Sequence, residues 1–305
     1  MESPLFENSL NLSYTQFLIF EITNQCTLAK AHAKICPIGL PGRYGKLDTS
    51  RPLTDDLILE CARIAYLELG FRGLVGWHYY CEPMIEWERI KKLAGRIKKE
   101  IPKAEFILWT NGTIMPENIS ELSLFSQIYL TNYFKKNWKF LKQELPNTQV
   151  KILSGEMDER SLGRKKFSRN RCLRPFNEMI VDYYGNGHIC CIDFRGQHKL
   201  GNIWTDGFRK VANNFLETQE LLSQQPIGSL SPNKDLPEIC LYCATGRMYN
   251  TGRLVEPIAD DAENYVESKY PLGIKRKMTL GTGYFIGKVE LFIKKRISSL
   301  CRFFS

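Results

Sequence analysis

Short apolar runs alternate with amphipathic helical stretches over residues 16–165, and this alternation constrains the fold more than any other feature. The stretches 53–69 and 84–101 keep apolar residues at helical spacing, and Thr54 is placed to cap the first of them. Such alternation predicts an α/β fold with a parallel sheet and helices outside it. Five runs are predicted as buried strands, too few for a closed eight-stranded barrel: QFLIFEIT (16–23), GLVGW (73–77), EFILWT (105–110), QIYLT (127–131) and QVKILS (149–154).

The charge of the chain is concentrated near its end. The 305 residues carry a formal net charge of +9, which would ordinarily suggest a nucleic acid or an anionic membrane as partner. Residues 274–305 hold eight basic residues against one acidic residue, Glu290, so the remaining 273 residues carry only +2. We therefore expect no nucleic-acid partner. The 274–305 pattern suits an amphipathic helix on an anionic membrane, docking onto a partner protein, or packing against the chain's own barrel.

Ten cysteines at uneven spacing indicate metal or redox chemistry. The N-terminus lacks a basic segment and a cleavage site, and no apolar run approaches the roughly 20 residues of a membrane span. We expect a cytoplasmic protein, or one lying peripherally at the inner face of the membrane. In that reducing compartment, cysteines are seldom paired as disulfides.

The most specific cysteine spacing follows a basic linker at 160–171. Cys172 precedes a hairpin signature with Gly185 in its turn and Cys190 after it, and Cys240 and Cys243 form a CLYC pair. Four thiolates on two turns suit either structural zinc or an iron–sulfur cluster. Adjacent residues of a strand face opposite ways, so either Cys190 or Cys191 faces the metal, and we choose Cys190.

A second constellation follows the first three predicted strands, where an α/β barrel keeps its chemistry. Cys26 and Cys36 lie in the loop after the first strand, GWHYYCEP (76–83) follows the second, and TNG (110–112) ends the third. A cysteine loop, a GEP-like element and a TNG in this order resemble the radical S-adenosylmethionine (SAM) superfamily. The cysteine-rich unit, with LGNI at 200–203, resembles the SPASM/twitch auxiliary-cluster domain of that superfamily.

This resemblance implies a fold and a division of the chain. It implies a partial (β/α) barrel of the radical SAM type at 1–159, a linker and small β-hairpin/helix SPASM/twitch domain at 160–257, and a basic amphipathic tail at 258–305. The cofactors it implies are SAM, a SAM-binding 4Fe–4S cluster and an auxiliary 4Fe–4S cluster, the last in place of zinc.

The resemblance also implies ligands. The auxiliary cluster would be held by Cys172, Cys190, Cys240 and Cys243. Glu82 matches the acid that accepts hydrogen bonds from the SAM amino group, and Asn111 is a candidate for polar SAM contacts.

The first cysteine loop departs from the superfamily's CxxxCxxC pattern, because only Cys26 and Cys36 are present there. His32, between them, is the expected third ligand through an imidazole nitrogen. Cys81 is the competitor, and altered or absent ligation is the remaining alternative.

The resemblance implies reductive cleavage of SAM and hydrogen abstraction from a substrate carbon. We expect oxidation or modification of a sugar, cyclitol or peptide, with an electron donor such as flavodoxin or ferredoxin. The altered first motif supports a different hypothesis, a degenerate scaffold or binding protein with one structural iron–sulfur or zinc site. A zinc-dependent nucleic-acid binder is disfavoured because the chain lacks a basic folded face.

Overall fold

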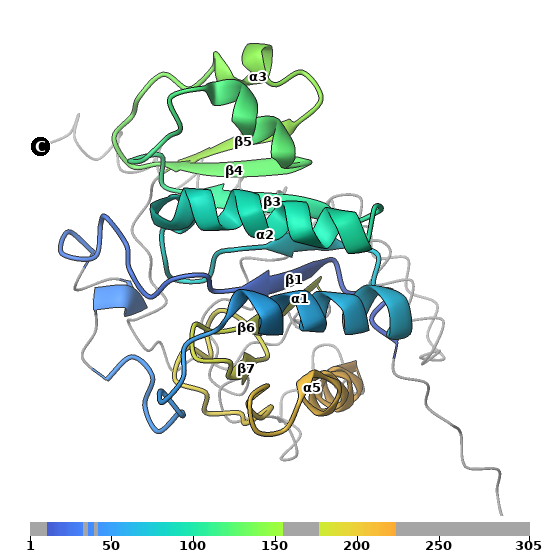
Figure 1. Cartoon of the computed structure of the whole chain (residues 1–305). Coiled ribbons are helices and arrows are strands. Elements are labelled where there is room, and N and C mark those ends of the chain that lie inside the picture. The colour runs from blue at the N-terminus through green and yellow to red at the C-terminus, as the bar shows by residue number, and fades with distance from the viewer. Residues whose placement is uncertain (1–10, 33–35, 40–41, 155–176, 224–305) are drawn as a thin grey trace, which may run out of the picture.

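The computed structural model describes residues 11–32, 36–39, 42–154 and 177–223. Within these residues, seven strands form one sheet in the order β5-β4-β3-β2-β1-β6-β7 (Figure 1). All neighbouring pairs are parallel except the antiparallel pair β6 and β7. The strands are β1 (Phe17–Phe20), β2 (Leu74–Gly76), β3 (Glu105–Thr110), β4 (Gln127–Asn132), β5 (Gln149–Ser154), β6 (Glu178–Val181) and β7 (Gly187–His188). The α/β class and the five predicted strands are therefore confirmed.

Helices connect the parallel strands, and two long ones, α1 and α2, lie on one face of the sheet (Figure 1). The α-helices are α1 (Asp55–Arg63), α2 (Trp87–Glu100), α3 (Leu141–Glu144) and α5 (Phe208–Ser223). The 3₁₀ segments are η1 (Pro37–Gly39), η3 (Pro83–Glu86) and η4 (Ile119–Leu124), and the π-helical turn η2 (Ile64–Glu68) extends α1.

The start of α1 follows from the sequence. Thr54 has an extended backbone, and its hydroxyl accepts a hydrogen bond from the backbone N–H of Leu57 at 3.3 Å, as predicted for an N-cap. Asp55 and Asp56 in the first turn add charges that favour a helix N-terminus. On α2, Ile90, Leu93 and Ile97 are fully buried at helical spacing.

The two faces of the sheet differ in composition. Side chains alternate between faces along each strand, and Leu18, Val75, Leu108 and Ile128 share one fully buried face. The opposite face carries polar and aromatic side chains that are buried or half-buried: Glu21, His78, Trp109, Tyr129, Lys151 and Asp182. This second face, together with the loops after its strands, is where polar chemistry is available.

The predicted hairpin forms, with Gly185 at φ +88° in its turn. Its first strand, β6, also pairs in parallel with β1, Phe17 opposite Glu178 and Phe20 opposite Val181. The hairpin that we expected to open a separate second unit therefore continues the sheet of the first. The domain boundaries at 159/160 and 257/258 lie outside the described residues and stay predictions.

Candidate functional site

The loops after β1, β2 and β3 meet at the carboxyl end of the sheet, around Glu82. The Glu82 backbone N–H donates to the carbonyl of Gln25 at 2.9 Å, which joins the β2 loop to the β1 loop. Its carboxylate accepts from Thr110 Oγ1 (2.7 Å) and the Met84 backbone N–H (3.1 Å) at Oε1, and from the Asn111 backbone N–H (2.8 Å) at Oε2. Burial raises the pKa of this carboxyl, and the three hydrogen bonds oppose the shift.

This arrangement leaves Glu82 able to accept one more donor. A carboxylate has about four lone-pair sites, and three are filled by Thr110, Met84 and Asn111. A cationic amino group at the second site on Oε2 would gain a charge-assisted hydrogen bond from a carboxylate that is only 1% exposed.

Asn111 links Glu82 to the cysteine loop. Its side-chain N–H₂ group donates to Thr27 Oγ1 at 3.1 Å and contacts Cys26 Sγ at 3.6 Å. Its side-chain oxygen accepts from the backbone N–H of Thr113 at 2.9 Å, which holds the turn that follows β3. The structure therefore brings together three of the sequence-predicted residues, Cys26, Glu82 and Asn111.

The remaining candidates of the first loop lie close by without completing a ligand set. Burial is the main cause of the raised pKa of Cys26, and the charges of Glu82 and Cys36 add to it. The His32 ring packs edge-on against Tyr133 at 4.6 Å, and burial lowers its pKa, which favours the neutral imidazole that binds metals. Cys81 donates from its thiol to the carbonyl of Trp77 at 3.5 Å.

The side chains of the first cysteine loop can be compared with the ligands that an iron–sulfur cluster needs. Among the described residues, no three histidine, cysteine or acidic side chains converge as a metal site would require. Cys26 and Cys36 therefore stay predicted cluster ligands, and the described residues of the loop bring no third donor to them. The choice between His32, Cys81 and altered ligation stays open.

The second cysteine group is only partly described. Cys172, Cys240 and Cys243 lie outside the described residues, whereas Cys190 and Cys191 are both buried. Strand β7 ends at His188, so the two cysteines lie in the bend after it, where the Cys190 carbonyl accepts from the Asp193 backbone N–H at 3.2 Å. The alternation of strand faces therefore does not apply to this pair, and Cys190 stays a prediction.

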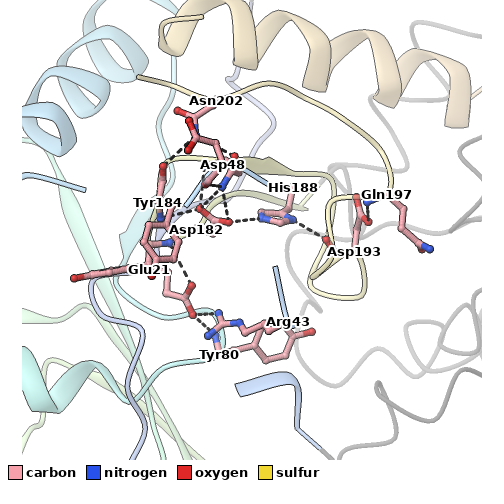
Figure 2. Close-up of polar contacts among 12 residues, drawn as sticks. Glu21, Arg43, Asp48, Tyr80, Asp182, Tyr184, His188, Asp193, Gln197 and Asn202 are labelled. Atoms are coloured by element: carbon pink, nitrogen blue, oxygen red, sulfur yellow. Dashed lines mark hydrogen bonds and ion pairs between the residues drawn. The ribbon is translucent and has the colours of Figure 1, made fainter. Parts of the chain in front are cut away.

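A buried polar network stabilises this bend (Figure 2). His188 is fully buried, with Nε2 3.1 Å from Asp182 Oδ2 and Nδ1 2.6 Å from the Asp193 carbonyl oxygen. Burial alone would lower the pKa of His188, but the hydrogen bond and charge of Asp182 raise it. Asp182 also accepts from Asn186, whose side chain in turn accepts from Asn202 Nδ2 at 3.0 Å. The LGNI segment thus stabilises the hairpin through the hydrogen bond from Asn202 to Asn186.

A buried ion pair lies beside this network. Glu21, directly after β1, pairs with Arg43 and accepts from the backbone N–H groups of Tyr80 (3.0 Å) and Tyr183 (3.3 Å) (Figure 2). Glu21 is 0% exposed and Arg43 6%. The Arg43 guanidinium lies over the rings of Tyr44 and Tyr80, with its central carbon 4.7 and 5.3 Å from their centroids.

Residues 79–82 connect the first cysteine loop with the hairpin that leads to Cys190 and Cys191. The Tyr80 hydroxyl donates to the Cys191 carbonyl oxygen, and the Tyr79 ring lies 5.2 Å from His188. Tyr79 and Tyr80 immediately precede Cys81 and Glu82 in the chain. One continuous segment therefore contacts the hairpin at one end and the Glu82 site at the other.

Sequence reasoning did not find the Glu21–Arg43 pair or the Asp182–His188 pair. An available signal was the presence of ionisable residues inside apolar runs: Glu21 in FLIFEIT, Asp182 in MIVDYY and His188 in GHICC. Arg43 carries no such signal, since it lies in a turn-rich stretch, LPGRYGK.

Comparison with known proteins agrees with this geometry. Residues 172–244 match the family model of SPASM, described as an iron–sulfur cluster-binding domain. The match spans Cys172, Cys190, Cys240 and Cys243, and confirms the iron–sulfur prediction for the second unit. The SPASM part of the resemblance is therefore confirmed, and the mostly parallel sheet described above agrees with the predicted α/β fold.

The fold resembles a particular solved protein. The structure titled "Crystal structure of BtrN in complex with AdoMet and 2-DOIA" aligns with a TM-score of 0.51 at 18% identity, covering 75% of this chain and 97% of that one. An open form of selenomethionine BtrN aligns with a TM-score of 0.46 over the same shares of both chains. No curated protein sequence matches the chain. Among the described residues, no helix is long and apolar enough to cross a membrane.

Proposed function

We propose that the protein is a radical SAM enzyme that oxidises or modifies a sugar, cyclitol or peptide. The observation that carries the proposal is the Glu82 carboxylate, held by Thr110 and Asn111 beside Cys26 at the carboxyl end of the sheet. The similar structure of BtrN was solved with AdoMet and 2-DOIA, which supports a site for SAM and a second small molecule in this fold.

Cys26, Cys36 and a third ligand, His32 in our proposal, would hold the SAM-binding 4Fe–4S cluster. Cys172, Cys190, Cys240 and Cys243 would hold an auxiliary 4Fe–4S cluster. Given one electron from a donor such as flavodoxin or ferredoxin, this cofactor chemistry cleaves SAM to methionine and a 5'-deoxyadenosyl radical, which removes a hydrogen atom from a substrate carbon.

The chain's own residues would bind and orient SAM. Glu82 would accept a hydrogen bond from its amino group at the remaining Oε2 site, and the hydrogen bonds from Thr110 and Asn111 fix the carboxylate plane. Because Glu82 is 1% exposed, water competes poorly for that position. Asn111 also keeps the cysteine loop next to Glu82 through its contacts with Thr27 and Cys26.

Product analysis tests the proposal. The full chain is reconstituted anaerobically with iron and sulfide, and supplied with SAM and dithionite. We expect 5'-deoxyadenosine by mass spectrometry, and its absence overturns the proposal. Glu82→Gln should weaken SAM binding about 10- to 100-fold, the worth of a hydrogen bond to a charged group. Glu86→Gln, on the neighbouring η3 segment, removes a charge outside the site and is the matched control.

A second candidate is a degenerate scaffold with one structural cluster. It is favoured by the lack of three converging metal ligands among the described residues. Iron and sulfide quantitation separates the two, since two 4Fe–4S clusters hold about eight irons per chain and one holds about four. About four irons, unchanged by Cys26→Ala, would favour the scaffold.

A further inference from the structure

Three buried polar groups beside the Glu21–Arg43 pair have no hydrogen-bond partner among the described residues. They are Arg43 Nε, the Tyr44 hydroxyl and the Tyr79 hydroxyl, here called the guanidinium–phenol cluster. Arg43 is 6% and Tyr79 9% exposed. An unpaired buried polar group costs about 1–3 kcal/mol, so three in one place indicate that something outside the described chain satisfies them.

The three side chains that carry these groups are neighbours. The Tyr44 and Tyr79 ring centroids lie 4.7 and 5.9 Å from the central carbon of the Arg43 guanidinium. Tyr79 also lies near the bend of the hairpin, because its ring centroid is 5.2 Å from that of His188, the last residue of β7. A molecule bound by the cluster would therefore lie beside the bend that carries Cys190 and Cys191.

The chemistry of the cluster selects an uncharged partner. Glu21 already neutralises Arg43, so a further anion would leave a net negative charge buried without compensation. An ordinary phenol keeps its proton at neutral pH, so Tyr44 and Tyr79 both present hydroxyl groups. The cluster thus offers one N–H donor and two hydroxyls that donate and accept, which complements an alcohol, itself one donor with two lone pairs.

We propose that Arg43, Tyr44 and Tyr79 recognise a hydroxyl group of an uncharged polyol. The proposal rests on the proposed function in one respect, namely that this polyol is the enzyme's substrate. Of the three proposed substrate classes, it favours the sugar and the cyclitol over the peptide. It also assigns substrate specificity to residues outside the Glu82 site.

Two phenylalanine variants provide a matched comparison. Tyr79→Phe removes a hydroxyl without a partner in the described chain, whereas Tyr66→Phe removes one that donates to the Gly73 carbonyl at 2.5 Å. Without ligand, we expect the melting temperature to stay the same or rise for Tyr79→Phe and to fall for Tyr66→Phe. A fall for Tyr79→Phe equal to that of Tyr66→Phe would overturn the proposal, because the Tyr79 hydroxyl would then be bonded within the protein.

Binding is measured on the reconstituted full chain by saturation-transfer NMR with myo-inositol, glucose and glycerol as probes, and with glucuronate and an alanine tripeptide for comparison. We expect at least one polyol to bind, and Tyr79→Phe and Tyr44→Phe each to weaken it about 2- to 10-fold, the worth of one hydrogen bond. Tyr66→Phe should leave binding unchanged. Absence of polyol binding, which would mean that water alone fills the cluster, or tighter binding of glucuronate or the tripeptide, overturns the proposal.

This outcome is independent of SAM cleavage. A wild-type protein that forms 5'-deoxyadenosine but binds no polyol would overturn the polyol site and leave the proposed function standing. A protein that binds polyols through Tyr79 but forms no 5'-deoxyadenosine would support the polyol site and overturn the proposed radical SAM function.

Discussion

Removing one partner of the Glu21–Arg43 pair should cost far more than removing both. Glu21 is 0% exposed, and without Arg43 it keeps two backbone donors among the described residues, at 3.0 and 3.3 Å. Breaking a buried pair leaves an uncompensated charge and costs about 3–5 kcal/mol. We expect Arg43→Met and Glu21→Gln each to lower the free energy of unfolding by about 3 kcal/mol. The double variant, which buries no charge, should cost only about 1 kcal/mol.

Urea unfolding followed by tryptophan fluorescence measures these values. The exposed pair Arg96–Asp56, with an N–O distance of 2.5 Å and side chains 45% and 86% exposed, is the control. Arg96→Met should cost less than about 1 kcal/mol, as exposed pairs do. If the double variant costs as much as the two single variants together, the charges do not stabilise each other and the reasoning is refuted.

Three further predictions concern other parts of the chain. Burial raises the pKa of Glu82 above 4.5, so the folded state keeps a proton that the unfolded state loses, and stability falls as pH rises from 4.5 to the raised value. The difference in unfolding free energy between wild type and Glu82→Gln should decline across that window, and a flat or rising difference contradicts the pKa. Gly95→Ala, with no atom within 4 Å of the new Cβ on α2, should stabilise by about 0.5–1 kcal/mol in urea unfolding. Gly76→Ala should destabilise by about 1–3 kcal/mol, because its Cβ would lie 2.6 Å from a methyl of Ile19, and equal effects would contradict the packing. Deleting 274–305, which lies outside the described residues, should abolish co-sedimentation with anionic vesicles while iron content stays unchanged, and undiminished co-sedimentation would refute a membrane role.

Local patterns predicted the elements of this fold well, because their cause is local. Strands β1 to β5 coincide with apolar runs, and Thr54 caps α1 because its hydroxyl reaches a backbone N–H three residues on. Cys61, interpreted as an apolar core residue, is 1% exposed on α1.

Long-range pairing accounts for what the sequence did not predict. Arg43 is buried because Glu21, Tyr44 and Tyr80 surround it, and those contacts arise only when the β1 and β2 loops meet. Strand β7 has two residues, too short for the alternation that was used to choose between Cys190 and Cys191. Of the candidate site, Glu82, Asn111 and Cys26 could be named from the sequence because the motifs follow successive strands, and the structure brings the three together.

The position of β1 has a consequence for synthesis of the chain. Strand β1 lies between β2 and β6, yet β6 begins at Glu178, about 160 residues after β1. Until β6 emerges from the ribosome, one edge of an apolar strand, Phe17–Phe20, has no partner to cover it. Uncovered apolar edges pair with other chains, so a nascent chain that stalls before Glu178 should aggregate or require a chaperone. The hairpin that leads to Cys190 thus also covers the open edge of β1, and residues 1–159 are not expected to fold as a soluble unit alone.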